Sequence, residues 1–253
     1  MDRTPASIGG FLIESVLGTG GMGTVYLARD SARLVALKVF HSGVPTPVAL
    51  DHPNIVPVYG RGETGDGRFW MAMQYVTGGD ADSELRAGRM SPTRAVHIIA
   101  GVAEALDFAH SHGVVHGDVK PSNFLLTDDD RVLLADFGVG PFVRDGVVLT
   151  SAAYASPEML RGKEVDGRAD VYSLGCSLFR LLTGKPPFFD AGSKSEVVDC
   201  HLHRAPPQPS RFAPWLAAAM DEVVAKAMAK DPDERYQSCR ALADAAAKVT
   251  PGR

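Results

Sequence analysis

The stretch HGDVKPSN, residues 116–123, carries the most information about the fold of this chain, and Asp136-Phe137-Gly138 follows it closely. Together the two segments supply acidic, amide and lysine side chains within a short length of sequence. Each segment is common when it occurs alone, so neither decides the fold by itself. Their value comes from their order and separation relative to two further motifs nearer the N-terminus.

The first of these motifs is rich in glycine, with Gly18, Gly20, Gly21 and Gly23 lying between two strand-like runs. Glycines lack a Cβ, so a hairpin turn that contains them can bring its backbone N–H groups close to phosphate oxygens. A purely structural turn is the alternative interpretation. A dinucleotide-binding fold would need a helix after the glycines, and this chain has a strand pattern there.

The second motif is the apolar run Val35-Ala36-Leu37, which ends in Lys38. The lysine would neutralise phosphate charge, although a single lysine on a strand usually faces solvent. Four such motifs are not expected by chance in this order and at these separations. They give the chain its resemblance to a known family.

The chain resembles the protein kinase superfamily, and specifically the bacterial eukaryotic-like (Hanks-type) Ser/Thr kinases of the actinobacterial kind. The resemblance extends from about residue 8 to residue 245. Three more segments match the family pattern: Ser156-Pro157-Glu158, Asp170 to Gly175, and Asp231 to Tyr236. The resemblance implies an ion pair between Glu158 and Arg235. It also implies a contact between Asp170 and the backbone of the catalytic loop.

The implied fold is α+β with two lobes, a small antiparallel β lobe and a larger, mainly helical lobe. Short β-branched or aromatic runs agree with this and predict strands at 11–17, 24–29, 34–40, 55–60 and 68–76. Helical apolar spacing predicts core helices at 93–113, 170–184 and 216–230, and Trp215 is expected in the core. We expect one kinase domain over 1–253, with a small lobe at 8–76, a hinge at 77–80 and a helical lobe at 81–248.

The resemblance and the needs of phosphoryl transfer together assign roles to five side chains. Asp118 would accept the proton of the substrate hydroxyl or orient that hydroxyl, and Lys120 would meet the γ-phosphate of ATP. A lysine at position 120 resembles Ser/Thr kinases rather than Tyr kinases. Lys38 would contact the α- and β-phosphates. Asn123 and Asp136 would hold one or two Mg²⁺ (or Mn²⁺) ions, since hard cations prefer oxygen ligands.

The same resemblance implies a nucleotide pocket. Glycines 18, 20, 21 and 23 would cover the phosphates, and Asp80 would bond the ribose. Apolar residues at the positions that line the adenine slot in the family are Leu17, Val25, Ala36, Met73, Val76 and Leu125. Ordinary core packing is the alternative interpretation for these apolar side chains.

One departure from the family lies between Lys38 and the segment His52-Pro53-Asn54. The family places a helix here, the C-helix, and a glutamate on it pairs with the lysine. Residues 39–50 contain no acidic side chain and include two prolines, so we expect this helix to be truncated or missing. The remaining candidate partners for Lys38 are Asp136, Asp51 and Glu63, and a pair with Asp136 would compete with metal binding.

A second departure is Gly117, where most regulated members have an arginine that receives a phosphorylated loop residue. We therefore predict that phosphorylation of Thr150 or Ser151 is not required for activity. Alanine variants at both positions should remain active, and loss of all activity in both single variants would contradict this prediction.

Two functions remain open from the sequence. The first is a Ser/Thr protein kinase that acts on hydroxyls of protein substrates, because the base, lysine, metal ligands and glycine loop are all present. The second is a pseudokinase, a nucleotide-binding interaction or scaffold module with little or no transfer activity. In either case the edge left by the missing helix would be a docking surface for a partner or a homodimer contact.

Composition narrows the partners and the compartment. The net charge of −4 and the pI near 6.1 give no basic footprint for nucleic acid, and no apolar run has the length of a membrane span. His201 and His203 lie near Cys200, but no fourth ligand is spaced to complete a metal site. The three cysteines are expected to be buried thiols, which indicates a reducing compartment, so we expect a cytoplasmic protein. The charge and the lack of a membrane-spanning run lead us to expect no nucleic acid or membrane partners.

Overall fold

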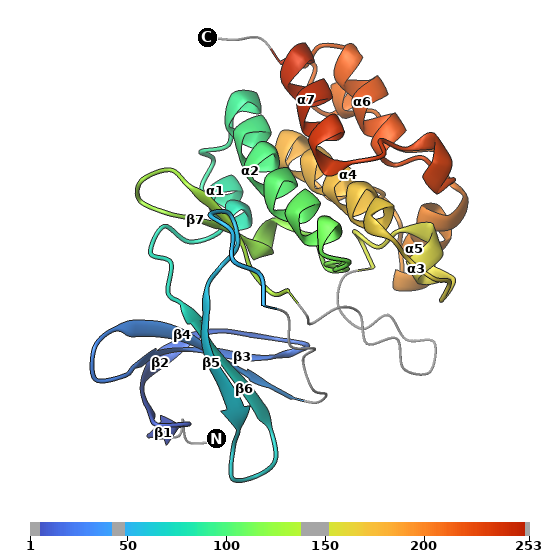
Figure 1. Cartoon of the computed structure of the whole chain (residues 1–253). Helices are drawn as coiled ribbons and strands as arrows, with labels where there is room; N and C mark the ends of the chain where they lie inside the picture. The colour runs from blue at the N-terminus through green and yellow to red at the C-terminus, as the bar shows by residue number, and fades with distance from the viewer. Residues whose placement is uncertain (1–5, 42–48, 138–151, 251–253) are drawn as a thin grey trace.

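The computed structural model describes residues 6–41, 49–137 and 152–250 (Figure 1). Six strands form one antiparallel sheet in the order β1-β2-β3-β4-β6-β5. Their bounds are Ser7–Ile8 (β1), Phe11–Gly20 (β2), Gly23–Arg29 (β3), Leu34–Phe40 (β4), Val58–Glu63 (β5) and Phe69–Gln74 (β6). Figure 1 shows this sheet as a small lobe at one end of the molecule.

Strand β4 is central in this sheet, and its alternation explains how the small lobe packs. Val35, Leu37 and Val39 face one side, where they pack with residues such as Ile8 and Ala28. Ala36 and Phe40 belong to the cluster on the opposite face. Lys38 shares the parity of that second set, because successive side chains of a strand point to opposite faces. The register of the strand therefore directs the lysine toward the other lobe.

The second lobe is mainly helical. Its α-helices are Ala81–Arg86 (α1), Pro92–Ser111 (α2), Pro157–Leu160 (α3), Gly167–Thr183 (α4), Lys194–His203 (α5), Ala219–Ala227 (α6) and Cys239–Val249 (α7). A short hairpin of Phe124–Leu126 (β7) and Val132–Leu134 (β8) lies against α2. Helix α4 runs through the centre of this lobe beside α2 and α7 (Figure 1). The resulting α+β two-lobed architecture confirms the predicted fold class.

Local signals set the ends of the two longest helices. The side chain of Ser91 accepts a hydrogen bond from the Arg94 amide at the start of α2, and Pro92 occupies the first turn. Gly184 ends α4 with a φ of 75°, a left-handed conformation that suits glycine. None of the described helices has both the length and the apolar character needed to cross a bilayer.

The strand predicted at 55–60 forms later, at Val58–Glu63. Pro57 has no N–H for a sheet ladder. Ile55, just before it, instead makes a single bridge to Leu134. Residues 49–57 contain no helix, and 42–48 lie outside the described residues. The described part of the segment after β4 thus agrees with a truncated or missing C-helix.

The expectation that Trp215 lies in the core is wrong, since 73% of this residue is exposed. Helix α6 begins only at Ala219, so Trp215 lies in the turn before it and not on the buried face of a helix. Its neighbour Leu216 packs against the core instead. The expectation of three buried thiols is confirmed for Cys176, Cys200 and Cys239.

Candidate active site

The catalytic-loop segment at 116–118 is held in place by Asp170 on α4, whose carboxylate is fully buried. Its Oδ2 accepts a hydrogen bond from the His116 amide and its Oδ1 accepts one from the Gly117 amide, both at 2.8 Å. Gly117 adopts a φ of 74°, which a residue with a Cβ rarely tolerates. The predicted contact between Asp170 and the loop backbone is confirmed.

His116 is also fully buried and joins two parts of the site. Its Nε2 lies 2.9 Å from the carbonyl oxygen of Ala135, and its Nδ1 accepts from the Asp118 amide at 3.1 Å. The ring therefore connects the loop before Asp118 with the strand end before Asp136. These contacts make His116 a scaffold residue of the loop.

Three predicted site residues come together directly after this loop. Lys120 Nζ lies 2.6 Å from Asp118 Oδ2, and Asn123 Nδ2 donates to the carbonyl oxygen of Asp118 at 2.8 Å. Asp118 and Asn123 are both buried, with 6% of each residue exposed. The loop thus places an acceptor, a cation and an amide within reach of one another.

Asp136 lies beside this group because the Ala135 amide donates to the Asn123 carbonyl oxygen at 2.9 Å. Asp136 has a φ of 69°, an uncommon conformation for a residue other than glycine. Lys38 Nζ is 2.6 Å from Asp136 Oδ2. Of the three partners that the sequence left open, the structure therefore pairs Lys38 with Asp136 rather than with Asp51 or Glu63.

The donor set of Asn123 and Asp136 fits a hard divalent cation. The Asn123 nitrogen is committed to Asp118, so the side-chain oxygen is the atom that Asn123 can offer to a metal. Asp136 offers carboxylate oxygens, one of which contacts Lys38. Oxygen ligands of this kind are those that Mg²⁺ and Mn²⁺ prefer.

The predicted adenine-slot residues mostly share one cluster under the sheet. Ala36 and Met73 are buried in it, while Val25, Val76 and Leu125 are partly buried against it. Leu17, the remaining apolar member of the predicted set, is 44% exposed on β2. Because the cluster also includes Leu125 of β7, it lies between the sheet of the small lobe and the β7–β8 hairpin.

The glycines of the predicted phosphate loop differ in their surroundings. Gly20 and Gly23 are register partners at the tip of the β2–β3 hairpin, and Gly21 lies in the turn between them. A Cβ at Gly23 would lie 2.3 Å from the carbonyl oxygen of Val39, whereas one at Gly18 or Gly20 would meet nothing within 4 Å. Gly23 is therefore required for close packing against β4, whereas Gly18 and Gly20 have open space beside them.

Asp80, the predicted ribose contact, has a structural task in this structure. Its carboxylate caps α1 by accepting from the Ser83 amide at 2.9 Å and from the Ser83 hydroxyl at 2.8 Å. Three other predicted residues, Gly138, Thr150 and Ser151, lie outside the described residues.

Comparison with known proteins shows the family of the chain. A family model described as the protein kinase domain matches residues 11–245. The chain belongs to the protein kinase family. The serine/threonine-protein kinase PknJ of Mycobacterium tuberculosis is 50% identical to this kinase-family chain over 270 residues, which include 96% of the chain.

Two other relatives have the same general character. Serine/threonine-protein kinase PknF of Mycobacterium tuberculosis is 42% identical and matches 92% of this kinase domain. Serine/threonine-protein kinase PknH of Mycobacterium bovis is 40% identical and matches 96% of it. The matches include 46%, 55% and 44% of the length of PknJ, PknF and PknH, so the chain spans about half the length of these relatives.

The family's structural ion pair is present in this kinase domain. Arg235 Nη1 and Nη2 lie 2.7 and 2.8 Å from the two carboxylate oxygens of Glu158. Burial acts to raise the pKa of Glu158, but the hydrogen bonds and the positive charge of Arg235, together with smaller hydrogen-bond contributions, lower the pKa overall. The implied pair between these two residues is confirmed.

Sequence reasoning missed two polar side chains of α2, one that supports the catalytic loop through Asp170 and one that supports the start of α7. His110 Nε2 is 2.8 Å from Asp170 Oδ2, the atom that also holds the His116 amide. Asp107 accepts from the backbone amides of Cys239 and Arg240 at 2.8 and 3.0 Å, which satisfies the first turn of α7. Only the helical spacing of these two polar residues, three apart beside an apolar face, could have suggested that they work together.

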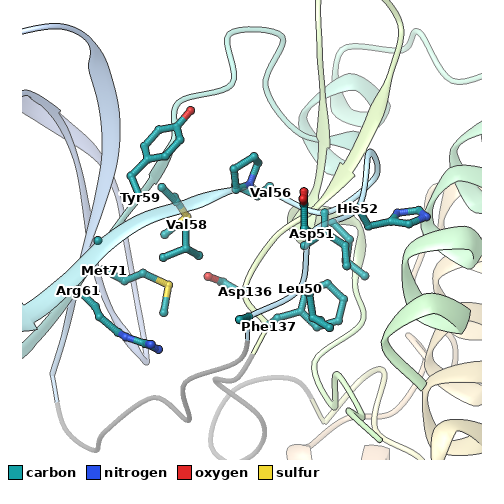
Figure 2. Close-up of a pocket in the computed structure, with 16 residues that line it drawn as sticks. Leu50, Asp51, His52, Val56, Val58, Tyr59, Arg61, Met71, Asp136 and Phe137 are labelled. Carbon is teal, nitrogen blue, oxygen red and sulfur yellow. The ribbon is translucent and has the colours of Figure 1, made fainter. Parts of the chain in front are cut away.

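A cavity of about 470 Å³ opens beside Asp136 in the described structure, where the C-helix would be expected (Figure 2). Much of its lining is apolar and includes Val56, Met71 and Phe137. Figure 2 shows Met71 and Arg61 on the strand side of the cavity, with Asp136 and Phe137 opposite them. Among the described residues, the Lys38–Asp136 pair therefore borders this cavity and has no helix packed over it.

Proposed function

We propose that this chain transfers the γ-phosphate of ATP to serine or threonine hydroxyls of protein substrates. The observation that carries the proposal is the loop in which Lys120 and Asn123 both contact Asp118, beside Asp136. The names of the mycobacterial relatives, which are serine/threonine-protein kinases, support the same reaction.

Each residue of this group has a task that fits its geometry. Asp118, a buried carboxylate fixed by its loop, accepts the proton of the incoming hydroxyl or orients it. Lys120 now contacts Asp118 and would exchange this contact for the γ-phosphate when ATP is bound. Asn123 and Asp136 would hold Mg²⁺ or Mn²⁺, which neutralises charge on the phosphates when bound.

The nucleotide would lie between the glycine hairpin and the apolar cluster around Ala36 and Met73, with Lys38 at its α- and β-phosphates. Leu17 and Val25 would cover the adenine from the strand side, and Leu125 would support it from the β7–β8 hairpin. Gly18, Gly20, Gly21 and Gly23 would cover the phosphates, with Val76 beside the adenine. Asp80 would bond the ribose in exchange for its contacts to Ser83.

A second function is favoured by one specific observation, the pair between Lys38 and Asp136. In this arrangement Lys38 contacts one oxygen of the Asp136 carboxylate, which would be a metal ligand in the active enzyme. A chain that remained in this state would bind partners with little or no phosphate transfer, as a pseudokinase does. The transfer experiment below separates this function from catalysis.

The cavity beside Asp136 is the surface for which we propose a docking or homodimer contact of the small lobe. Its support is the exposed apolar rim, since 48% of Val58 and 39% of Tyr59 are exposed on the edge strand β5. Sedimentation of the protein with and without Val58→Asp tests the homodimer. A single species at the monomer mass across the accessible concentration range would exclude it.

We further propose one domain over residues 1–253, with lobes at 8–76 and 81–248 joined by a hinge at 77–80. The end of β6 at Gln74 and the start of α1 at Ala81 support these limits. A cytoplasmic location is also proposed, and it is supported by the three buried free thiols.

The deciding experiment measures transfer of labelled γ-phosphate from ATP to the protein itself and to a generic basic protein, with Mg²⁺ or Mn²⁺. Asp118→Asn is the matched control, since it keeps the size of the side chain and removes the base. We expect signal from the parent protein and a loss of about 10²-fold or more in the control. Equal signal from both proteins, or none from folded parent protein, would reject the kinase function.

A further inference from the structure

Three candidate metal ligands lie together outside the candidate active site, where α2 meets the start of α7. Within the described part of the chain, Asp107, His110 and Cys239 each place a ligand atom within 4.8 Å of those of the other two. Asp107 and His110 both lie on α2, and Cys239 is the first residue of α7. Zinc sites in proteins are built from thiolates, imidazoles and carboxylates of this kind.

The imidazole of His110 is held in the orientation that a metal ligand needs. Its Nε2 lies 2.8 Å from Oδ2 of the buried Asp170 carboxylate. A carboxylate only accepts hydrogen bonds, so Nε2 carries a proton and donates it. Neutral His110 then has its lone pair on Nδ1, which lies 3.9 Å from Asp107 Oδ1, too far for a hydrogen bond. Metal-bound histidines are typically oriented by such a partner on their other nitrogen.

Asp107 keeps the capacity to bind a cation although it already accepts two hydrogen bonds. Its Oδ1 and Oδ2 accept from the amides of Cys239 and Arg240 at 2.8 and 3.0 Å. A carboxylate has about four acceptor positions, so about two remain. In the described structure, no lysine or arginine side chain lies within ion-pair distance of Asp107 or Asp170. The negative charge around His110 is therefore not neutralised by a basic side chain.

Two of the three side chains are open to solvent. The side chains of Asp107 and His110 are 29% and 18% exposed, whereas Cys239 is fully buried. A Cβ at Gly167 would lie 2.5 Å from His110 Nδ1, so the glycine leaves room beside this nitrogen. A cation can enter from the exposed side and keep a water molecule as its fourth ligand.

We propose that Asp107, His110 and Cys239 bind one Zn²⁺ ion, with water as the fourth ligand. Zinc bonds of about 2.0–2.3 Å would place the ligand atoms roughly 3.5 Å from one another, so each side chain moves by about 1 Å or less. Burial, followed by the charges of Asp170 and Asp107, raises the pKa of Cys239, and the metal-free thiol keeps its proton. Zinc binding would release this proton to solvent and form a zinc–thiolate bond. The ion would join α2 to α7 and fix the histidine that supports Asp170.

Cobalt(II) is the probe for this site, because a cobalt–thiolate bond gives a charge-transfer band in the near ultraviolet and zinc gives none. The reduced, metal-free whole chain is titrated with Co²⁺ and then with Zn²⁺, without ATP. We expect a thiolate band that saturates at one cobalt per chain and disappears when zinc displaces the cobalt. Asn123 and Asp136, the proposed metal ligands of the candidate active site, offer only oxygen atoms, so metal bound there gives no such band.

Two variants each remove one ligand. Cys239→Ala should abolish the band. Asp107→Asn should weaken cobalt binding by roughly tenfold or more, since even changes in the outer-shell partners of a metal have effects of this size. Asp107→Asn keeps the size of a partly exposed side chain and one oxygen for the amides of α7. It therefore keeps the test valid if Cys239→Ala unfolds.

Cys200→Ala is the matched control. Cys200 is also a buried thiol, it precedes His201 in the chain, and it lies outside the group. This variant should bind cobalt like the parent protein. Zinc should raise the melting temperature of the parent and of Cys200→Ala, and it should leave that of Cys239→Ala unchanged.

Four outcomes overturn the proposal: no thiolate band in the parent protein, an equal band in Cys239→Ala, equal cobalt affinity in Asp107→Asn and the parent, or loss of the band in Cys200→Ala. The last would place the metal at α5. A failure of the proposed phosphate transfer leaves this result unaffected, because neither Asp107 nor Cys239 is assigned to that reaction.

Discussion

Two ion pairs of this molecule each join residues far apart in the sequence, and they differ in how many hydrogen bonds their charged groups make. In the helical lobe, Arg235 holds Glu158 with two parallel contacts and is itself fully buried. It also donates to the carbonyl oxygens of Ala229 and Arg168, both at 2.8 Å, and of Lys230 at 3.2 Å. Every part of the guanidinium therefore has an acceptor.

In the small lobe, Lys38 meets Asp136 through one contact of 2.6 Å. The Asp136 side chain is 20% exposed and lines the 470 Å³ cavity. A fully satisfied buried pair fixes one structure, because each partner loses several contacts when it is disturbed. A pair with one contact beside open space can exchange its partner. The first pair is therefore built for stability, and the second suits a site where metal and phosphate compete for the same groups.

Replacing Arg235 with Met should have the largest effect on stability. It leaves Glu158 buried without its partner and removes the donors to three carbonyl oxygens, so we expect a loss of about 3–5 kcal/mol in the free energy of unfolding. Urea denaturation measures this loss. Arg240→Met, at an exposed position on α7, is the control and should change stability by less than about 0.5 kcal/mol. Equal effects of the two variants would show that the helical-lobe pair is not structural.

The helical lobe should also depend on pH through His201, which is fully buried and bonded to the Tyr172 hydroxyl at 2.9 Å. Burial lowers the pKa of His201 to about 4 from 6.5. The unfolded chain therefore binds more protons between these values, and stability that is present above pH 6.5 is lost as the pH falls toward 4. We expect a loss on the order of 3 kcal/mol across this window.

His201→Gln keeps a polar partner for Tyr172 and cannot titrate, so the difference between its pH profile and that of the parent isolates this contribution. Urea unfolding from pH 7 to 4.5 provides both profiles. Parallel profiles would mean that His201 keeps an ordinary pKa in the folded protein.

Asp170→Asn should have an intermediate effect on stability, because Asp170 holds the catalytic loop at His116 and Gly117. An amide has one oxygen, so it cannot accept from the His116 and Gly117 amides at the two positions that the carboxylate uses. One buried N–H is left unsatisfied, and we expect a loss of about 1–3 kcal/mol. Hydrogen exchange should accelerate at these two amides. Asp244→Asn, on an exposed face of α7, should leave their exchange unchanged.

Lys38→Met should have the smallest effect on stability and completes the comparison. The remaining Asp136 carboxylate borders the cavity and can be hydrated there, so we expect a change within about 1 kcal/mol in urea unfolding. Phosphate transfer should nevertheless fall sharply, because Lys38 is proposed at the nucleotide phosphates. A loss as large as that of Arg235→Met would show that both pairs are structural.

Much of the fold followed from local patterns in the sequence. Short β-branched or aromatic runs predicted β2, β3, β4 and β6, and helical spacing predicted α2, α4 and α6. The error at 55–60 arose because Pro57 interrupts a run that otherwise has strand composition. The error at Trp215 arose because a large apolar residue was assigned to the core without knowing where α6 begins.

The sequence by itself determined the family and the catalytic loop, because these depend on residue types at fixed separations, and the resemblance to the family then implied the Glu158–Arg235 pair. Only the tertiary structure decided that Lys38 pairs with Asp136, 98 residues away, and that His110 supports Asp170. It alone gathered Asp107, His110 and Cys239 into one group. Charge partners of this kind depend on which distant segments pack together and on how much water remains between them, and neither property is written in the local order of residues.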